Sequence, residues 1–275
     1  MPEVVTQQLP KPYYQDKWVT IYHGDCREIL PQIPDKSVNL VLTSPPYDDL
    51  RLYGGQGFQF SDLPSMLYSI LCGGGCCVWV VGDQVINGSE SGSSFRQALT
   101  FIDNGFNLHD TMIFQKNNTS LPDGTRYGQE FEYMFVFSKG SPIIFNPLVD
   151  RKRKWMGNSR YTKKRKPNGD IVLFTRDQES RSNKRGNIWL YDVGFNKGSS
   201  NPITFQHPAT FPESLANDHV ISWSNDGNII LDPFLGSGTT CYCAKKLNRH
   251  SIGIEIEEKY CEIAARRCSQ EVMEL

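Results

Sequence analysis

The stretch that most constrains the fold of this chain is Thr-Ser-Pro-Pro-Tyr at residues 43–47, which follows the apolar run Val38 to Leu42. A short apolar run of this kind is typical of a buried β-strand. Because proline has no backbone N–H, two prolines in succession end the hydrogen bonding of a strand, and we predict that the strand stops at Ser44. The prolines then form a stiff turn in which the carbonyls of Ser44 and Pro45 keep fixed directions.

This turn has the features of a binding surface for a planar polar group. A rigid carbonyl acceptor beside the flat ring of Tyr47 suits a planar group that carries an N–H donor, such as the exocyclic amine of a nucleobase. The alternative is a strand that ends at prolines and a tyrosine that only packs, because proline-rich strand ends are common. These five residues alone do not decide between the two interpretations.

Length and composition indicate one main domain with an insertion. The chain has 275 residues, of which 39% are hydrophobic, and this is enough for one sizeable core. Residues 1–17 lack the apolar core of a signal peptide, and no apolar run approaches the ~20 residues of a membrane span. The eight cysteines form no Cys-x-x-Cys pair, which favours a reducing compartment and no metal site. We therefore expect a cytoplasmic protein that binds no membrane.

Strand and helix patterns alternate along the chain, which predicts the α/β class. The apolar segment at residues 18–22 ends at Gly24-Asp25, where Asp25 either lies at the ligand-binding edge of a sheet or caps a helix that begins near Arg27. Helical spacing is found at residues 61–72, and again at Phe95, Ala98, Leu99 and Ile102. Further strands are predicted at residues 76–81, 108–116 and 132–139, and the polar run 87–94 is predicted to be a loop.

Residues 151–197 are strongly basic. They contain 14 Lys and Arg and 4 Asp and Glu, a net charge of +10, whereas the rest of the chain has 15 and 26 and a net charge of −11. Basic residues with interleaved aromatic rings are typical of a surface that binds a nucleic acid backbone, although a solvated charged loop is the alternative. Asn168-Gly169 precedes the apolar run 171–174 and predicts a β-hairpin within this insertion.

The last quarter of the chain contains a strand, a glycine turn and a helix. Apolar residues 228–231 lead into Asp-Pro-Phe-Leu-Gly-Ser-Gly-Thr-Thr at 232–240, and Glu255 ends the next predicted strand, 19 residues after Gly236. A carboxylate at this place can bind the hydroxyls of a ribose, as in dinucleotide-binding βαβ units. The loop lacks the lysine of a phosphate-binding loop and the Gly-x-Gly-x-x-Gly pattern. An adenosine ligand without phosphates, such as S-adenosylmethionine, therefore suits it.

Together these motifs resemble those of the amino-methylating DNA methyltransferases of restriction–modification type. Thr-Ser-Pro-Pro-Tyr is similar to the catalytic motif of that family, and residues 232–240 resemble its S-adenosylmethionine motif. Gly24-Asp25 and the segment His-Pro-Ala-Thr-Phe-Pro-Glu-Ser-Leu at 207–215 resemble two further cofactor motifs. Their order along the chain resembles the circularly permuted beta subgroup, with the basic insertion in the place of its target-recognition region.

The resemblance implies a Rossmann-like methyltransferase fold, with a mostly parallel sheet of seven strands of which one is antiparallel. It implies a catalytic half at residues 1–148, a target-recognition insertion at 149–200 and a cofactor-binding half at 201–275. The implied catalytic residues are Ser44, Pro45, Pro46 and Tyr47. The implied cofactor-binding residues are Asp25, Thr43, Phe211, Pro212, Asp232, Phe234, Gly236, Ser237, Gly238, Thr239 and Glu255. The candidate DNA-binding residues are Arg151, Lys152, Arg153, Lys154, Lys163, Lys164, Arg165 and Lys166.

The activity that follows from the resemblance is site-specific transfer of a methyl group from S-adenosylmethionine to N4 of cytosine in duplex DNA, on a base flipped out of the helix. Serine at position 44 is associated with cytosine in this family, and N6 of adenine is the alternative substrate. None of the eight cysteines follows a proline, which argues against methylation at C5 of cytosine. The resemblance also implies a prokaryotic or phage-like context. It allows a separately encoded restriction endonuclease as partner, and a monomer or a homodimer.

Two functions outside this class compete with it. Glu257-Glu258-Lys259 is loosely similar to the metal-binding string of some nucleases, although acids also suit the first turn of a helix. A DNA-binding module that has lost its catalytic site is the second alternative, and the intact Ser-Pro-Pro-Tyr sequence argues against it.

Overall fold

The computed structural model describes residues 9–46, 60–117, 124–150, 161–175, 184–193 and 212–270. The chain divides into two compact units, the first made of Met1–Asn146 and Asn187–Leu275 and the second of Pro147–Gly186. The family resemblance implies an insertion at residues 149–200, but residues 188–191 form a strand of the first unit. The second unit therefore ends before the basic segment does.

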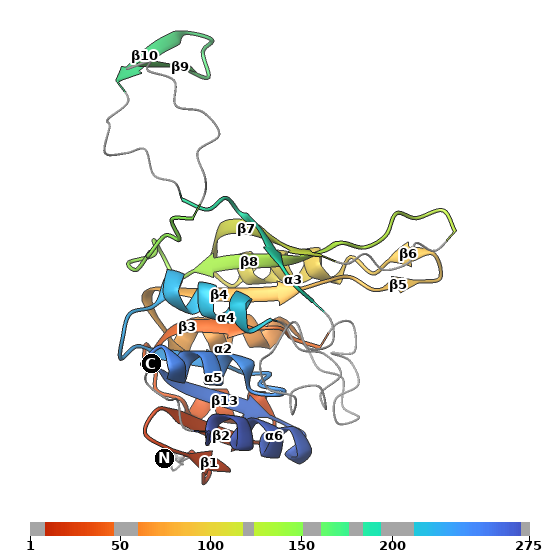
Figure 1. The fold of residues 1–275 in the computed structure, drawn as a ribbon, viewed down its shortest axis with the longest axis vertical. Helices are drawn as coiled ribbons and strands as arrows, with labels where there is room; N and C mark the ends of the chain where they lie inside the picture. The colour runs from red at the N-terminus through yellow and green to blue at the C-terminus, as the bar shows by residue number, and fades with distance from the viewer. Residues whose placement is uncertain are drawn as a thin grey trace, which may run out of the picture. The chain divides into compact units, whose positions relative to one another are not determined.

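The first unit is built on one sheet, whose strand order is β1-β2-β13-β12-β3-β4-β8-β7-β11 (Figure 1). The strands are β1 (Tyr14–Gln15), β2 (Val19–His23), β3 (Val38–Thr43), β4 (Leu71–Val81), β7 (Asn107–Lys116), β8 (Phe131–Ser138), β11 (Ile188–Tyr191), β12 (Ile229–Asp232) and β13 (His250–Glu255). Strands from the two ends of the chain thus lie side by side at the centre of the sheet, as the permuted order predicts.

The sheet contains the expected seven strands and a short strand at each edge. Strands β2, β13, β12, β3 and β4 run parallel, and β8 is antiparallel to both β4 and β7. The edge strands are β1, antiparallel to β2, and β11, parallel to β7, so the main sheet of the described residues has nine strands and not seven.

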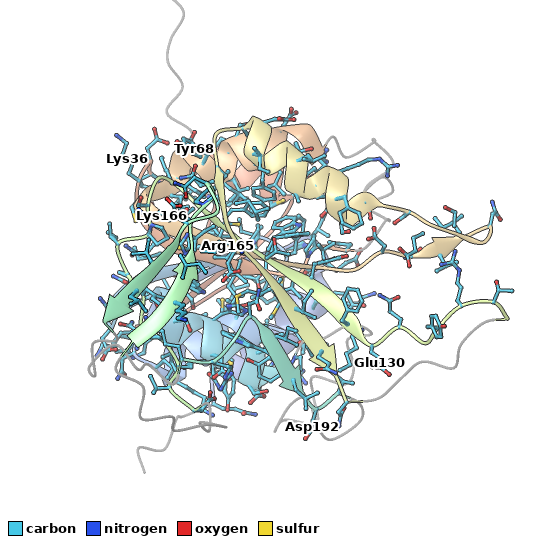
Figure 2. The ribbon with its side chains drawn as sticks, turned by 90° about the horizontal axis from the view of Figure 1, so that it is seen from above. Lys36, Tyr68, Glu130, Arg165, Lys166 and Asp192 are labelled. Atoms are coloured by element: carbon cyan, nitrogen blue, oxygen red, sulfur yellow. The ribbon has the colours of Figure 1, made fainter. Side chains whose placement is uncertain are left out.

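Helices cover both faces of this sheet. They are α1 (Cys26–Ile29), α2 (Leu63–Ile70), α3 (Ser93–Asp103), α4 (Glu213–Trp223), α5 (Thr239–Lys246) and α6 (Glu258–Cys268), with 3-10 turns η1 (Leu30–Gln32) and η4 (Phe60–Asp62). Helices α2 and α3 pack together on one face, and α4 and α5 lie on the other (Figure 2). Helix α6 packs against α5 and against strands β2 and β13. This arrangement is the Rossmann-like fold that the sequence predicts.

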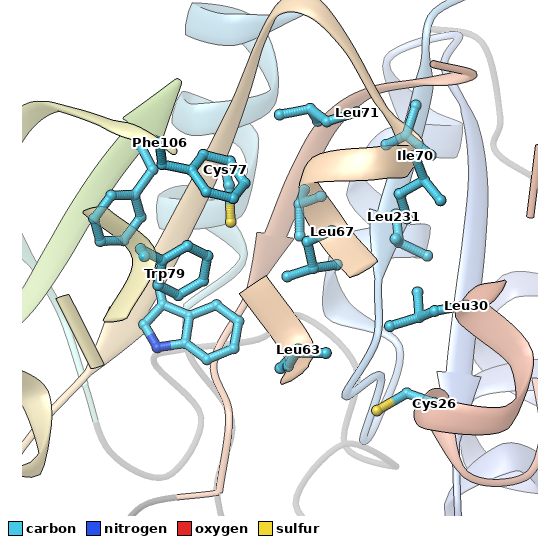
Figure 3. Close-up of a cluster of buried hydrophobic side chains, with 14 of the residues drawn as sticks. Cys26, Leu30, Leu63, Leu67, Ile70, Leu71, Cys77, Trp79, Phe106 and Leu231 are labelled. Atoms are coloured by element: carbon cyan, nitrogen blue, oxygen red, sulfur yellow. The ribbon is translucent and has the colours of Figure 1, made fainter. Parts of the chain in front are cut away.

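The larger core lies between the sheet and helices α1, α2 and α3 (Figure 3). Leu67 of α2, Trp79 of β4 and Phe101 of α3 are fully buried in it. The indole nitrogen of Trp79 donates a hydrogen bond of 2.7 Å to the side chain of Gln97, so the polar atom of the largest core residue is satisfied. This core fixes β3 and β4 and therefore the turn that follows β3.

Two local predictions are wrong. Helix α2 ends at Ile70, and β4 begins at Leu71, so the helix predicted to reach residue 72 gives way to a strand longer than predicted. The polar run 87–94, predicted as a loop, contains the turn and the second strand of a small hairpin formed by β5 (Val85–Ile86) and β6 (Ser89–Glu90). Its turn is Asn87-Gly88, with both φ angles positive, as two-residue hairpin turns require.

The second unit contains the predicted hairpin, β9 (Tyr161–Arg165) and β10 (Ile171–Thr175). Gly169 has a φ of 91° in its turn, a conformation that glycine adopts most readily. Among the described residues of the whole chain, no helix has both the length and the apolar composition needed to cross a membrane.

Candidate active site

The predicted catalytic turn and the predicted cofactor turn begin at neighbouring strand ends. Strands β3 and β12 are parallel partners, so Thr43 and Asp232 end them at the same edge of the sheet. The Thr43 hydroxyl donates a 2.6 Å hydrogen bond to the Asp232 carboxylate, and both side chains are buried. Strand β3 ends just before Ser44, as the prolines predict, and Pro45 is buried while Ser44 and Pro46 are half-buried.

Asp232 is a buried acid that is held by hydrogen bonds. Burial raises the pKa of Asp232 to about 6, although hydrogen bonds from the hydroxyls of Thr43 and Thr240 and from the N–H of Phe234 act in the opposite direction. The hydrogen bond from the Phe234 N–H measures 3.1 Å. The carboxylate therefore connects β3, the turn after β12 and the first turn of α5.

This shift predicts a specific pH dependence for an Asp232→Asn variant. Because the pKa of Asp232 is higher in the folded chain than in the unfolded chain, the ionised carboxylate lowers the free energy of unfolding above pH ~6, and this loss is recovered as pH falls towards 4. The amide carries no charge, so we expect the free energy of unfolding of wild type, relative to the variant, to rise by about 1 kcal/mol from pH 8 to pH 5.

Urea denaturation of both proteins at the two pH values measures this difference. Asp25→Asn is the matched control, because burial raises the pKa of Asp25 but hydrogen bonds from Arg27 outweigh it and lower the pKa below its ordinary value. The Asp25 carboxylate therefore titrates below the tested range, and its variant should show no such change. If the difference in free energy of unfolding between wild type and Asp232→Asn were the same at both pH values, the pKa of Asp232 would not be raised in the folded chain.

The turn after β12 is held from three sides. The N–H of Leu235 donates to the carbonyl of Ile254 at 2.9 Å, and the N–H of Gly236 donates to the Glu255 carboxylate at 2.8 Å. Gly236 and Gly238 have φ angles of 52° and 80°, in the left-handed region. A Cβ atom on Gly238 would lie 2.9 Å from the Cβ of Ala264, so this glycine also allows the close packing of the turn on α6.

Glu255 ends β13 next to this turn. Its side chain is 8% exposed, and its second oxygen accepts the N–H of Glu257 at 2.9 Å. Burial raises the pKa of Glu255, although the N–H groups of Glu257, Gly236 and Ile256 act against it. Since an ionised carboxylate has about four acceptor positions, Glu255 keeps capacity to accept a hydroxyl from a ligand.

Asp25 lies at the end of the neighbouring strand β2. The N–H of Gly24 donates to the Glu255 carbonyl at 2.9 Å, which places the Gly24-Asp25 segment beside the end of β13. Asp25 accepts the N–H of Arg27 at 2.8 Å and pairs with the Arg27 guanidinium, so it caps α1 as one of the two sequence interpretations predicts. Its position after the end of β2 also agrees with the second interpretation, in which Asp25 lies at the ligand-binding edge of the sheet.

The remaining predicted site residues fall into three groups. Pro212 precedes α4 and forms its N-cap. Residues Lys163, Lys164, Arg165 and Lys166 lie on β9 and just after it, in the second unit. Tyr47, Phe211 and Arg151 to Lys154 lie outside the described residues.

One residue of this region was not predicted from the sequence. Arg267 of α6 is fully buried and donates to the carbonyl of Ser237 at 3.2 Å and to the hydroxyl of Thr239 at 2.9 Å. Its signal in the sequence is an arginine four and three residues after the buried Ile263 and Ala264, where helical spacing favours an apolar side chain.

The nuclease alternative finds little support in the described residues. The acids of Glu257-Glu258-Lys259 are the exposed N-cap and first turn of α6, as the helix-dipole interpretation predicts. No group of three or more His, Cys, Asp or Glu within the described ranges is placed to hold a metal ion.

Comparisons with known proteins identify the family of this chain. The family model for N6/N4 DNA methylases matches residues 38–266. The orphan methyltransferase M.BamHII of Bacillus amyloliquefaciens is 51% identical over 238 residues, which cover 86% of this chain and 90% of that protein.

Two solved structures have a similar fold. The PvuII DNA methyltransferase (cytosine-N4-specific) superposes with a TM-score of 0.73 at 21% identity, over 98% of this chain and 92% of that one. The putative DNA modification methylase TTHA0409 of Thermus thermophilus, in complex with S-adenosylmethionine, superposes with a TM-score of 0.58 at 25% identity, over 91% and 96% of the two chains. The chain therefore belongs to the N6/N4 DNA methylase family, as an amino-methyltransferase of restriction–modification type that uses S-adenosylmethionine.

Proposed function

We propose that this enzyme methylates N4 of cytosine, in duplex DNA, at the edge of the sheet where β3 and β12 end. The observation that carries the proposal is Ser44, which directly follows β3 and holds the first place of the Ser-Pro-Pro-Tyr turn. The PvuII enzyme, whose fold is similar, is cytosine-N4-specific, and this supports the same choice. N6 of adenine remains the second candidate, because both amines need the same acceptors.

The residues of the cofactor region fit an adenosine group. Glu255 is a buried carboxylate with acceptor capacity towards the hydroxyls of a ribose, and Gly236 and Gly238 keep side chains out of the turn beside it. We assign Glu255 to the ribose, the turn Phe234–Thr239 to the adenosine and Pro212, with Phe211, to the methionine end. Asp25, Thr43 and Asp232 support these contacts from the adjoining strands. When bound, S-adenosylmethionine supplies the electrophilic methyl group on its sulfonium sulfur.

The catalytic turn has to activate a weak nucleophile. The amine lone pair of cytosine is delocalised into the ring, which lowers its reactivity. Hydrogen bonds from the two N–H groups to Ser44 and to the Pro45 carbonyl favour a pyramidal nitrogen. The lone pair of such a nitrogen is less delocalised into the ring and is available to attack the methyl group. Because Pro45 is buried and the strand before it is anchored through Thr43 and Asp232, these acceptors are held in place before the base arrives.

Access to this turn requires that the cytosine leave the duplex, at a cost of a few kcal/mol. Tyr47, next to the prolines in the sequence, is assigned to stack on the flipped base. Positioning and electrostatics then provide most of the rate acceleration, since methyl transfer is direct and needs no covalent cysteine.

The base that is methylated can be identified directly from the product. DNA methylated by the purified enzyme should give N4-methylcytidine after digestion to nucleosides and mass spectrometry. N6-methyladenosine without N4-methylcytidine would reverse the choice of base and leave the remaining assignments in place.

We assign DNA binding to the basic insertion. In the β9–β10 hairpin, Lys163 pairs with Leu173 and Arg165 with Ile171, so these four exposed residues share one face. A two-stranded ribbon of this kind has dimensions that the major groove of DNA accepts. Two basic and two apolar side chains on one face provide contacts both for phosphates or guanine edges and for thymine methyl groups.

Salt dependence tests this assignment. Each phosphate contact adds roughly 0.9 to the slope of log affinity against log salt concentration, so replacing Arg151, Lys152, Arg153 and Lys154 with glutamine should flatten the slope. The double variant Lys163→Gln/Arg165→Gln should reduce the magnitude of this slope by up to about 2. Fluorescence anisotropy with duplex DNA between low and moderate salt measures the slopes.

Lys259→Gln is the control, since this exposed lysine lies on α6 and outside the insertion. It should leave the slope unchanged. Equal slopes for wild type and both insertion variants would place the DNA backbone elsewhere on the protein.

A further inference from the structure

A fully buried arginine, Arg267, lies on the face of α6 that packs on the cofactor turn. Burying a guanidinium costs free energy that its partners rarely recover in full, and its Nε has no hydrogen-bond partner among the described residues. An apolar residue would suit the spacing of the buried residues Cys261, Ala264 and Cys268. Stability alone is therefore a poor reason for an arginine at this position.

The contacts of Arg267 connect two segments that are distant in the sequence. Nη1 donates to the Ser237 carbonyl at 3.2 Å and to the Thr239 hydroxyl at 2.9 Å, both in the turn after β12. Nη2 donates to the Glu213 carboxylate at 2.8 Å, in the first turn of α4 and directly after Pro212. One guanidinium thus holds the glycine turn and the start of α4 together.

The surroundings keep the guanidinium in one orientation. The ring of Tyr242 lies 4.8 Å from the guanidinium carbon, which favours stacking of the two planes. Ala264, three residues before Arg267 on α6, contacts the turn at Gly238, where a Cβ atom would lie 2.9 Å away. Helix α6 therefore fixes the turn by a steric contact on one side and by directed hydrogen bonds on the other.

We propose that Arg267 is a positioning residue for S-adenosylmethionine, which sets the orientation of the turn 236–239 and its distance from the start of α4. This inference rests on the cofactor site proposed above, in which the turn and Pro212 bind opposite ends of the cofactor. When the bridge is lost, the two segments are free to separate, and the cofactor has to restore their spacing when it binds. Affinity for the cofactor should then fall without any loss of a direct contact.

A buried arginine on the same half of the unit provides a matched control. Arg249 is 8% exposed and binds Ser224, Asp226 and the carbonyl of Leu247, none of which belongs to the proposed cofactor site. Arg249→Met and Arg267→Met both remove a buried, paired guanidinium. Both variants should therefore unfold at lower urea concentration than wild type, and only Arg267→Met should lose cofactor affinity.

The experiment is calorimetric titration of S-adenosylhomocysteine, the product form of the cofactor, into the full-length variants. We expect Arg267→Met to weaken binding by roughly tenfold or more, and Arg249→Met to bind as wild type does. Glu213→Gln in the Arg267→Met background should raise the free energy of unfolding, because it removes a carboxylate that has lost this cation, but it should not restore affinity, because the bridge between the two segments is still absent. Arg267→Lys keeps the charge but not the fork of donors, so it should fold well and still bind more weakly than wild type.

Two results would overturn the assignment: unchanged affinity in both Arg267 variants, and an equal loss of affinity in Arg249→Met. Glu255→Ala, titrated in parallel, separates this inference from the site on which it rests. If Glu255→Ala binds weakly and the Arg267 variants bind normally, the cofactor site stands and the role of Arg267 fails. If all of them bind normally, the cofactor site itself is wrong.

Discussion

Glu255→Ala is expected to bind S-adenosylmethionine about 5- to 150-fold more weakly than wild type, the range that corresponds to a loss of 1–3 kcal/mol from charge-assisted hydrogen bonds. The alanine removes the acceptor assigned to the ribose. It also leaves the N–H groups of Gly236 and Glu257 without the carboxylate that they bind at 2.8 and 2.9 Å. The dissociation constant, measured by calorimetry, reports both effects together.

Two further variants separate them. Glu255→Gln keeps one carbonyl acceptor for the turn, so it should retain more of the affinity than the alanine variant. Glu257→Ala changes an exposed neighbour whose side chain makes a surface ion pair with Lys259, and it should bind as wild type does. Unchanged affinity in Glu255→Ala would remove this residue from the cofactor site.

Tyr47→Ala is expected to methylate DNA about 5- to 150-fold more slowly in a single turnover, because stacking of an aromatic ring on a base contributes roughly 1–3 kcal/mol. Binding of the cofactor should be unaffected, since the ring is assigned to contact only the flipped base. Rapid-quench measurement of labelled methyl transfer at saturating enzyme and cofactor gives the rate.

Tyr47→Phe is the control, because it keeps the ring and removes only the hydroxyl. It should react at close to the rate of wild type. A Tyr47→Ala protein that also fails to bind the cofactor would show that this tyrosine packs within the fold and does not stack on the base.

Much of the fold is predictable from the sequence, because strong local signals agree with one another. The apolar run before Pro45 became β3, and the Asn168-Gly169 turn became the β9–β10 hairpin. The same Asn-Gly signal is present at Asn87-Gly88, but the polar residues around it carry no strand pattern. Its hairpin was therefore missed.

Helix α3 shows where periodicity predicts an element but not its buried face. Phe95, Leu99 and Ile102 have helical spacing, yet they are 51%, 60% and 40% exposed. The face that packs inward carries Ser94, Gln97, Ala98 and Phe101. Gln97 is buried because it accepts the hydrogen bond of the Trp79 indole, and Ser94 because it donates to Asp83. Hydrogen bonds to residues distant in the sequence determine which face of α3 is buried, and the local spacing of apolar residues carries no information about these partners.

In the candidate site, too, residues within local motifs could be predicted and contacts between distant residues could not. Motif residues such as Asp232 and Glu255 could be named from their place at strand ends. Arg267 could not, because its partners Ser237 and Glu213 lie 30 and 54 residues away in the sequence. The hydrogen bond that joins Thr43 to Asp232 spans 189 residues and exists only because β3 and β12 pair in the sheet.

The most direct test of the proposed site is a crystal structure of the enzyme with S-adenosylhomocysteine. We predict that the ribose hydroxyls lie within hydrogen-bonding distance of the Glu255 carboxylate and that the sulfur faces the turn Ser44–Pro46. Adenosine bound away from Glu255, or a sulfur directed away from that turn, would contradict the account.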